Sequence, residues 1–485
     1  MTDPGRLSRR AVLALGGVAL LTACSPSPMN PRQKPMATPL PSASAVSTTV
    51  SQMLGSEGFF VAHRGSGDNW PEHTLTAYRS ALRAGADAVE VSVCATSDGV
   101  LVCHHDLSAF RTLGVQRDIA EMTWNEISQL HVDARTWLGP DTPPEPVSRL
   151  DDVFAALGND VLIFIEDKQG NNTRALLDMM DEQPRSTERF VWKQWAPAKQ
   201  VAMAKERGYA AWGYFDSEQM GRLDEFADRF DALGVPTQLS DAELTRVVAT
   251  GRPVICWEVH FYSEVARLNR MGAAGKMCSN IPYLTGGKRS SSDDFRSGRR
   301  AAGDLPSGFQ RLGWHAQPAI VPGRGAVRLQ SQGQRSYLMG SLARPGLTLA
   351  SMELTMQWPD KAPDTGTAGV VFGLTADAPG GDGERGDSSG YELHLAADGT
   401  LRVSERDAGR VGTVLAQQPG AAPRAGEKIV LRIDAEGARI RIRRSGSPAS
   451  IDVTDARWRG PWIRLFKDYE SSLAVEFSGI AVEAA

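Results

Sequence analysis

Apolar runs and amphipathic stretches alternate along the first half of the chain, from Gly58 to about Gly287. The runs are rich in β-branched residues, and the stretches between them have helical periodicity over about ten to fifteen residues. About eight runs occur in roughly 230 residues: GFFVAHRG, DAVEVSVCAT, VLIFIEDK, FVWKQWA, YAAWGYF, VPTQLS, VICWEVHF and AAGKMCSNIP. Buried strands that alternate with helices are typical of a parallel sheet. We therefore predict an α/β fold with a (β/α)8 TIM barrel over residues 57–287. An open doubly wound sheet is the alternative, although no GxGxxG follows the first strand.

The second half of the chain has a different pattern. After a polar, aperiodic stretch at 288–304, which we predict to be a linker, apolar and polar residues alternate from 305 to 485. Asp398-Gly399 and Glu436-Gly437 lie between alternating runs, where such pairs signal a hairpin. Several such strands with little helix predict an antiparallel β-sandwich.

One segment of this half, GYELHLAADGTLRVSERDAGRVGTVLAQQ, resembles a concanavalin-like, laminin-G-like jelly roll. That class often binds sugars, so a glycan partner is an expectation from fold analogy. A spacer or a lid beside the barrel mouth is the alternative role.

The first fifty residues have the layout of an export signal. Two arginines precede an apolar run from Ala11 to Ala23, which is shorter than the about 20 residues that a membrane-spanning helix needs. The run ends in LTAC, which resembles the lipobox of bacterial lipoproteins and implies a signal peptide at 1–23 and acylation of Cys24. The SRRAVL sequence also resembles a twin-arginine signal. Residues 24–50 are rich in Ser, Pro and Thr and are predicted to form a flexible tether. We expect an exported lipoprotein on the extracytoplasmic face of a bacterial cell membrane; a chance apolar N-terminus with a free cysteine is the alternative.

Composition narrows the possible partners. The chain has 485 residues, which at about 100 to 200 residues per domain predicts two to four domains. Its 53 Lys and Arg against 57 Asp and Glu give a formal net charge of −4. Nucleic-acid binding needs a basic face that displaces phosphate counterions, so we predict no nucleic-acid partner. Five cysteines are too few for a disulfide-built scaffold, and they lack the CxxC spacing of a structural zinc site.

Polar residues cluster where the predicted barrel strands end, the face on which such barrels build active sites. An arginine can hold two phosphoryl oxygens, two separate histidines can act as general acid and base, and carboxylates on neighbouring strands can hold a hard cation. Together these groups suit hydrolysis of a phosphate ester. The candidate residues are His63, Arg64, Glu72, Glu90, Ser92, His105, Asp106, Glu166, Lys168 and Trp257.

The order of these motifs resembles the glycerophosphodiester phosphodiesterase family. The family has the motifs HRG, PENT, E-x-D and DG-then-HD in this order, followed by E-x-K and a Trp in W-T-V-N. The first four correspond to the segments HRGSGDNWPEHTLTAY and GADAVEVSVCATSDGVLVCHHD of this chain. The resemblance covers about residues 57–287. It implies a TIM-barrel enzyme that uses a divalent cation, Mg²⁺ or Ca²⁺, to split a small glycerophosphodiester into glycerol phosphate and an alcohol.

The resemblance also implies a role for each matched residue. The acid–base pair and the phosphate ligands are His63, His105, Arg64 and Lys168. The metal ligands are Glu90 and Glu166, and Glu72 either coordinates the metal or lies just beyond its ligands. Trp257 lines the substrate pocket. We prefer His105 to its neighbour His104 because only His105 precedes Asp106 in the family register.

Four positions depart from the family motifs. Ser92 stands where the family has a second carboxylate ligand, and His73 replaces the Asn of PENT. A lost carboxylate lowers the charge of the cation site, although a hydroxyl can still coordinate Mg²⁺, so we predict weaker or altered metal dependence. Glu258 and His260 replace the Thr and Asn of the last motif and could supply a compensating ligand. Because alternate strand residues point to opposite faces, Glu258 should face away from Trp257, which argues against that compensation.

Two other functions stay open at this point. Without the full ligand set, the barrel could be catalytically impaired and bind a phosphodiester or a glycan at the cell surface, and Ser92 favours this alternative. The second is a phospholipase-type activity that forms a cyclic phosphate.

The remaining four cysteines are predicted to form two disulfides. If Asp-Gly at 98–99 makes a two-residue turn, Cys94 lies opposite Cys103 in a pair whose Cα atoms are about 4.5 Å apart, which a disulfide can bridge. Cys256 and Cys278 lie on the predicted seventh and eighth strands, which are neighbours in a closed barrel. Export permits disulfides. Buried free thiols are the alternative.

Overall fold

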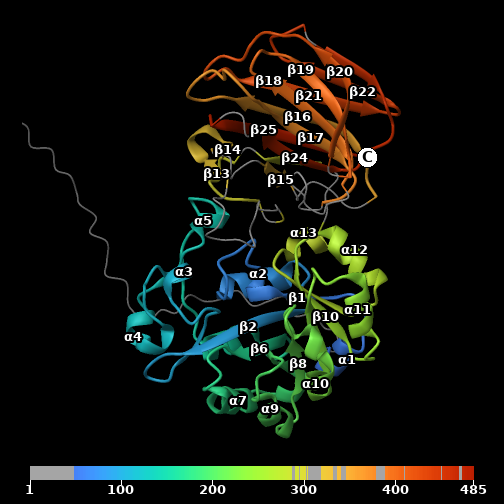
Figure 1. Ribbon diagram of the computed structural model, residues 1–485. Coiled ribbons are helices and arrows are strands. Elements are labelled where there is room, and N and C mark those ends of the chain that lie inside the picture. The colour runs from blue at the N-terminus through green and yellow to red at the C-terminus, as the bar shows by residue number, and fades with distance from the viewer. Residues whose placement is uncertain are drawn as a thin grey trace, which may run out of the picture. The chain divides into compact units, whose positions relative to one another are not determined.

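The structure is a computed structural model that describes residues 48–286, 290–293, 295–301, 303, 318–330, 336–339, 346–377, 388–408, 410–448, 450–468 and 472–485. The predicted signal peptide, Cys24 and most of the predicted tether lie outside these residues. Ala43–Ala485 form one compact unit, in which an α/β barrel precedes an all-β region (Figure 1). None of the helices in the described part of the chain is both long and apolar enough to cross a membrane.

Eight parallel strands close into a barrel, which confirms the predicted (β/α)8 fold. Each strand pairs with the next, and β1 closes the ring by pairing with both β2 and β11. The strands are β1 (Phe59–Ala62), β2 (Ala88–Ala95), β6 (Leu162–Asp167), β7 (Phe190–Trp195), β8 (Ala210–Tyr214), β9 (Ala232–Pro236), β10 (Val254–Val259) and β11 (Gly275–Cys278).

Helices follow the barrel strands and cover them with their apolar faces. They are α2 (Leu75–Arg83), α6 (Leu150–Leu157), α7 (Thr173–Asp181), α8 (Ser186–Arg189), α9 (Val201–Glu206), α10 (Leu223–Phe226), α11 (Asp241–Val248), α12 (Tyr262–Arg270) and α13 (Ile281–Thr285).

Aromatic and aliphatic side chains fill the interior of the barrel. Because strand residues alternate between faces, Phe59 and Val61 of β1 point inward with Phe164, Trp212 and other buried residues. At the end where the strands begin, three buried residues of helix α1 (Val50–Leu54) join this cluster. The barrel is therefore packed and closed at that end.

An excursion between β2 and β6 adds a small subregion beside the barrel. Its first strand, β3 (Leu101–Cys103), pairs antiparallel with β2. Its other elements are α3 (Phe110–Leu113), α4 (Trp124–Ile127), β4 (His131–Val132), α5 (Arg135–Leu138) and β5 (Glu145–Pro146).

The predicted register of the β2–β3 hairpin is wrong. The turn has three residues, 97–99, because the Thr96 N–H donates to the Val100 carbonyl at 3.0 Å and the last turn residue has a left-handed φ of +81°. Three-residue hairpin loops with a left-handed residue are common. The extra residue shifts the pairing by one position, which turns Cys94 and Cys103 to opposite faces and into different apolar clusters.

The second predicted disulfide also fails. Cys256 lies opposite Lys276 on β11, and Cys278 lies opposite Val259 on β10. All four described cysteines are buried free thiols, so the alternative holds.

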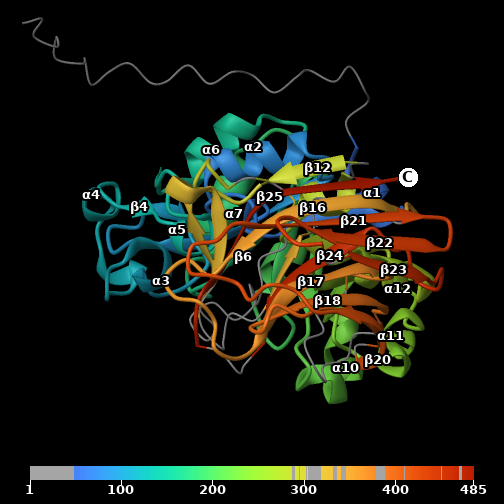
Figure 2. The same cartoon turned by 90° about the horizontal axis from the view of Figure 1, so that it is seen from above.

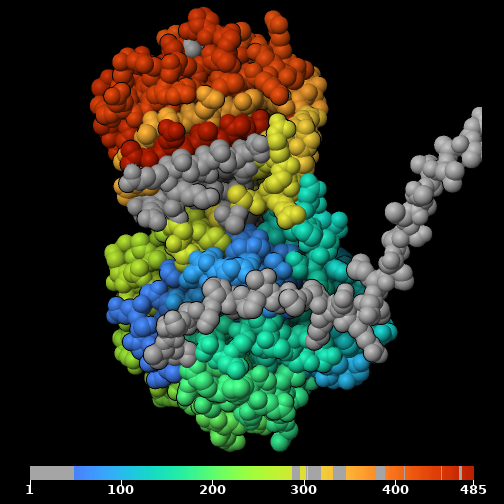
Figure 3. Space-filling view, turned by 180° about the vertical axis from the view of Figure 1, so that it is seen from behind, coloured from blue at the N-terminus to red at the C-terminus, as the bar shows by residue number. Residues whose placement is uncertain are grey.

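The C-terminal region is built from two antiparallel sheets that share one core. Strands of the first sheet lie side by side in Figure 2, and Figure 3 shows the orange and red part of the region as a closely packed surface. The first sheet holds β13 (Ala319–Val321), β14 (Ala326–Leu329), β25 (Val475–Ala484), β16 (Leu349–Gln357), β21 (Ile429–Glu436), β22 (Arg439–Arg444) and β23 (Ser450–Thr454). The second holds β15 (Ser336–Met339), β24 (Trp462–Lys467), β17 (Thr367–Leu374), β18 (Gly390–Ala396), β19 (Leu401–Asp407) and β20 (Arg410–Gln418).

Both predicted hairpins of this region are confirmed, since β18 pairs with β19 and β21 with β22 across the two turns. The predicted linker at 288–304 differs from expectation. It contains β12 (Ser290–Asp293), which pairs with β25 and so extends the first sheet. We predicted strands from the alternation of apolar and polar residues. Two strands can pair through their backbones without that alternation.

One carboxylate joins the sandwich to the barrel. Asp377 accepts hydrogen bonds from the backbone N–H groups of Tyr262, at 2.5 Å, and Ser263, at 2.9 Å, at the start of α12. The Tyr283 hydroxyl donates to the same carboxylate at 2.6 Å and accepts from the Trp462 indole at 2.9 Å. A carboxylate at a helix N-terminus satisfies free backbone donors, so this contact stabilises the junction.

Candidate active site

The first part of the site is a tight turn at the end of β1. Residues His63–Gly65 form a single 3-10 turn in which Arg64 has a left-handed φ of 52°. Its backbone N–H donates to Glu90 Oε2 at 2.8 Å, which fixes the turn against β2. Gly65 is required here, because a Cβ at this position would lie 2.8 Å from that of Ala77.

Three charged side chains meet inside the mouth of the barrel. The Lys193 ammonium, on β7, donates to Glu90 Oε1 at 2.9 Å and to Glu166 Oε2 at 2.5 Å. All three side chains are at most 6 % exposed. Lys193 is a functional candidate that the sequence did not reveal. A signal was present, because residues two apart on a strand point the same way and Val191 of this strand points into the barrel.

The charges of this cluster stabilise one another. Burial disfavours each charge, but the two carboxylates outweigh it and raise the pKa of Lys193. Lys193 in turn holds the pKa of Glu90 well below its usual range and lowers that of Glu166, against the opposing effect of burial. Tyr214 Oη donates to Glu166 Oε1 at 2.7 Å, and its ring lies 5.2 Å from the Lys193 nitrogen. The cluster is therefore ionised at neutral pH.

Lys168 lies at the edge of the same cluster. Its ammonium is 3.3 Å from Glu166 Oε2, and its side chain is 16 % exposed. Burial lowers its pKa, although the neighbouring Glu166 opposes that effect. An ammonium has three N–H donors, so Lys168 keeps donors for a ligand.

The residues do not fit the implied divalent cation. Ser92, at the position of the missing carboxylate, donates its hydroxyl proton to Glu90 Oε1 at 2.8 Å. Glu90 and Glu166 already share the Lys193 ammonium. Among the described residues, no group of three or more His, Cys, Asp or Glu side chains is arranged to hold a metal ion.

Glu72, which the resemblance places at the metal or just beyond its ligands, pairs with two arginines. Its carboxylate accepts two hydrogen bonds from Arg111, one of them at 2.9 Å, and lies 3.3 Å from Arg64 Nη1. Burial opposes its charge, but the two guanidinium groups hold its pKa well below the usual range. Glu72 therefore positions the arginines of the mouth.

His105 lies on the outer side of the site. Its Nδ1 is 2.7 Å from Asp106 Oδ1, and its Nε2 is 3.0 Å from Arg64 Nη2. Because a guanidinium only donates, Nε2 accepts this bond and Nδ1–H donates to Asp106. Burial and then the charge of Arg64 lower the pKa of His105 to about 4. His104, in contrast, is buried with both ring nitrogens bonded, to the Asp106 carbonyl and to Thr112 Oγ1.

His63 lies deeper and begins a chain of buried and half-buried groups. Its Nδ1 is 3.1 Å from both Glu258 Oε1 and Ser279 Oγ. Glu258 Oε2 is 3.4 Å from His260 Nε2, and His260 Nδ1 is 2.9 Å from Asp68 Oδ2. Burial lowers the pKa of His63 to about 4 despite Glu258. Against the effect of burial, Asp68 and Glu258 raise the pKa of His260 well above its usual value.

The prediction that Glu258 faces away from the mouth is wrong. The pairing of β10 with β11 shifts register between Cys256 and Val259, so strict alternation does not hold there. Trp257 still packs with the inner cluster, in edge contact with Tyr214 at 6.1 Å between ring centroids. Both Trp257 and Glu258 thus belong to the mouth.

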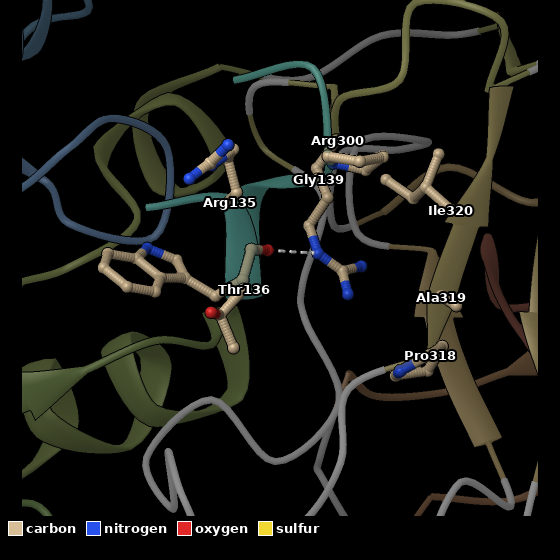
Figure 4. A pocket seen from close by; sticks show the side chains of 9 residues that line it. Arg135, Thr136, Gly139, Arg300, Pro318, Ala319 and Ile320 are labelled. Carbon is tan, nitrogen blue, oxygen red and sulfur yellow. Dashed lines mark hydrogen bonds between the residues drawn. The ribbon is translucent and has the colours of Figure 1, made fainter. Parts of the chain in front are cut away.

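A separate pocket of about 450 Å³ lies between α5 and β13 (Figure 4). Arg135 and Arg300 line it from one side, and Pro318 and Ile320 line it from the other. Arg300 Nε donates to the Trp137 carbonyl at 2.7 Å. None of the predicted site residues lines this pocket.

Comparisons with known proteins agree with the motifs. Residues 63–280 match the model of the glycerophosphoryl diester phosphodiesterase family. The chain is 31% identical over 258 residues to the probable glycerophosphodiester phosphodiesterase 1 of Mycobacterium tuberculosis strain H37Rv, covering 47% of this chain and 91% of that protein. It is 38% identical over 111 residues to a glycerophosphodiester phosphodiesterase of Caldanaerobacter subterraneus subsp. tengcongensis, covering 23% of this chain and 45% of that protein.

A phosphodiesterase of Oleispira antarctica, in complex with the product sn-glycerol-3-phosphate, is 19% identical with a TM-score of 0.42; the match covers 47% of this chain and 95% of that one. The alignment with the Caldanaerobacter protein spans less than half of that relative's length. From the family model and the M. tuberculosis relative together, the chain belongs to the glycerophosphoryl diester phosphodiesterase family.

Proposed function

We propose that the barrel hydrolyses glycerophosphodiesters to glycerol phosphate and an alcohol. The observation that carries the proposal is the pair of histidines at one mouth, each with Nδ1 beside a carboxylate: His63 beside Glu258 and His105 beside Asp106. A carboxylate at Nδ1 fixes the tautomer and stabilises the imidazolium that forms when Nε2 takes a proton. Family membership supports this activity.

The cations of the mouth would bind the phosphodiester. Arg64 and Lys168 supply N–H donors at the outer edge, and the Lys193 ammonium lies beneath them between two carboxylates. One histidine takes a proton from the attacking oxygen, and the other gives a proton to the leaving oxygen. Both ring pKa values lie near 4 in the free protein, and the negative charge of a bound phosphodiester raises them, which favours the protonated acid.

Hydrolysis of glycerophosphocholine by wild type, His63→Ala and His105→Ala tests the proposal. We expect each substitution to lower kcat by about 100- to 10,000-fold, the range for loss of a general acid or base. His131→Ala is the matched control, because His131 is exposed on β4, and we expect no change. Full activity of His63→Ala would refute the assigned mechanism.

Ser92 favours a second candidate, a barrel that binds phosphodiesters without turnover. Calorimetric binding of glycerophosphocholine with no product in the same sample would identify it. If product forms, ³¹P NMR separates the proposed hydrolysis from the phospholipase-type alternative, because a cyclic phosphate has its own resonance.

We also propose that lipid at Cys24 anchors the chain to the membrane and that the sandwich binds glycan. The LTAC motif supports the lipid anchor, and the resemblance of one sandwich segment to a concanavalin-like jelly roll supports glycan binding. Metabolic labelling with a fatty acid, in wild type and Cys24→Ser, tests the anchor. Retention of the full chain on cell-wall polysaccharide tests the sandwich, and no retention would remove the glycan from the proposal.

A further inference from the structure

We propose that the Lys193 ammonium takes the place of the divalent cation in this active site, so that the barrel binds and hydrolyses its phosphodiester without a metal ion. The inference rests on the proposed function for its catalytic part, but its structural part, exclusion of the metal, stands independently. Three observations carry it: the position of the ammonium, the charge of the cluster and the orientation of Ser92.

The ammonium occupies the space that a cation would need. Its nitrogen lies 2.9 Å from Glu90 Oε1 and 2.5 Å from Glu166 Oε2, on the two strands that carry the implied metal ligands. A hard cation binds carboxylate oxygens at about 2.0 to 2.6 Å and so needs the same space between them. A metal could enter only if Lys193 moved away, and its charge would then remain in a barrel interior lined by Tyr214 and other side chains. That displacement is unfavourable because a buried unpaired charge is costly.

The formal charge of the cluster supports the exchange. In the family pattern, three carboxylates around a divalent cation leave one net negative charge. Here Ser92 replaces one carboxylate, and two carboxylates around one ammonium leave the same net charge. One carboxylate fewer and a singly charged ammonium between the remaining two therefore leave the net charge that the phosphodiester meets unchanged.

Ser92 is oriented as a donor. Its hydroxyl gives its proton to Glu90 Oε1 at 2.8 Å, the same oxygen that Lys193 contacts. The neutral hydroxyl stabilises the carboxylate beside the ammonium, but it does not supply the negative charge that a carboxylate ligand gives a hard cation.

The reaction balances without a metal. A water oxygen forms a new bond to phosphorus as the bond from phosphorus to the leaving alcohol oxygen breaks. One proton of the water passes to one histidine, and the other histidine gives a proton to the leaving alcohol. Lys193 keeps its protons throughout and stabilises the phosphoryl oxygens with its positive charge.

Metal binding by the full chain, measured without substrate, tests the inference apart from the proposed function. Isothermal titration and electron paramagnetic resonance with Mn²⁺ should show no stoichiometric site in wild type. The double variant Ser92→Asp/Lys193→Met restores three carboxylates and removes the ammonium. We expect this variant to bind one Mn²⁺ and to gain thermal stability when Mn²⁺ is added. One Mn²⁺ bound to wild type and lost in Glu166→Gln would overturn the inference. So would a double variant that folds, as shown by circular dichroism, and does not bind Mn²⁺.

Turnover of glycerophosphocholine tests the catalytic part. We expect wild type to keep its activity in EDTA and Lys193→Met to lose about 100- to 1,000-fold, the effect of removing one electrostatic contact to the transition state. Mn²⁺ should restore activity to the Ser92→Asp/Lys193→Met variant, which also shows that the loss in Lys193→Met is not a failure to fold. Lys205→Met is the matched control, since Lys205 pairs with Asp231 on the surface. The inference would be overturned if EDTA abolished the activity of wild type and Mg²⁺ restored it. If no variant turned over substrate but the metal-binding results were as expected, only the proposed function would be overturned.

Discussion

The two histidines of the mouth are held in different ways. His63 belongs to the barrel itself, and its partner Glu258 contacts a second imidazole, His260. His105 belongs to the excursion between β2 and β6, and its partner Asp106 also forms an ion pair with Arg111 at 2.6 Å. A guanidinium stays charged throughout, so it neutralises part of the charge that Asp106 offers to His105.

This difference separates two roles. Among the described ion pairs Glu258 contacts imidazoles alone, so no guanidinium or ammonium paired with it offsets its attraction for a proton on His63. We therefore expect His63 to act as the base and His105 as the acid, whose Nε2 carries a proton once Arg64 binds the phosphodiester in place of the His105 ring.

The largest effect should come from Glu258→Gln. The amide keeps the shape of the side chain but loses the charge that stabilises the His63 imidazolium, so we expect kcat to fall by about 100- to 1,000-fold. Steady-state turnover of glycerophosphocholine measures it. A fall of less than tenfold would show that Glu258 does not serve His63.

Asp106→Asn should have a smaller effect, a fall in kcat of about tenfold. Arg111 already compensates much of the Asp106 charge, and Arg64 still contacts His105. The same assay compares the two variants directly. Equal losses in Asp106→Asn and Glu258→Gln would remove the distinction between the two histidines.

The third prediction concerns the pH dependence of stability. The pKa of His63 and that of His105 are both lowered from 6.5 to about 4, so the unfolded chain binds more protons than the folded one between these pH values. The free energy of unfolding should therefore fall as the pH drops from 6.5 to 4. His63→Gln or His105→Gln should each reduce that fall by at most about 3 kcal/mol.

His260 should have the opposite effect, because its pKa is raised. Its contribution to stability is present in full below pH 6.5 and is lost as the pH rises through its folded pKa. Urea unfolding of His260→Gln between pH 4 and 9 should show a loss that is largest at low pH. A loss that does not change with pH would contradict the charged state of His260.

Much of the fold followed from the order of apolar runs. The eight barrel strands were predicted with small offsets; the run VPTQLS, for example, overlaps only the end of β9, which starts at Ala232. The errors arose where local geometry broke a regular count. One extra turn residue changed the register of Cys94, and a register shift in β10 turned Glu258 to the mouth. Neither has a strong signal in the sequence.

The candidate site was predicted in part. Motif order brought His63, Arg64, Glu90 and Glu166 to one end of the barrel, where the structure places them. Lys193 was missed because it lies outside the motifs, although an inward-facing lysine in an apolar strand needs buried partners. The carboxylates that pair with this lysine lie on other strands, far from it in the sequence. Their contact with it becomes visible only in the closed barrel.

Helix α1 has a consequence for how molecules enter and leave the site. Its Val50, Met53 and Leu54 close the barrel at the end opposite the mouth, and the packed interior leaves the barrel without a passage through it. Substrate and both products must therefore use the same opening. The product that keeps the phosphate also keeps its contacts with Arg64 and Lys168, so it should leave after the alcohol and compete with the next substrate. Glycerol phosphate should act as a competitive inhibitor, and the order of departure follows from a barrel with a single entrance.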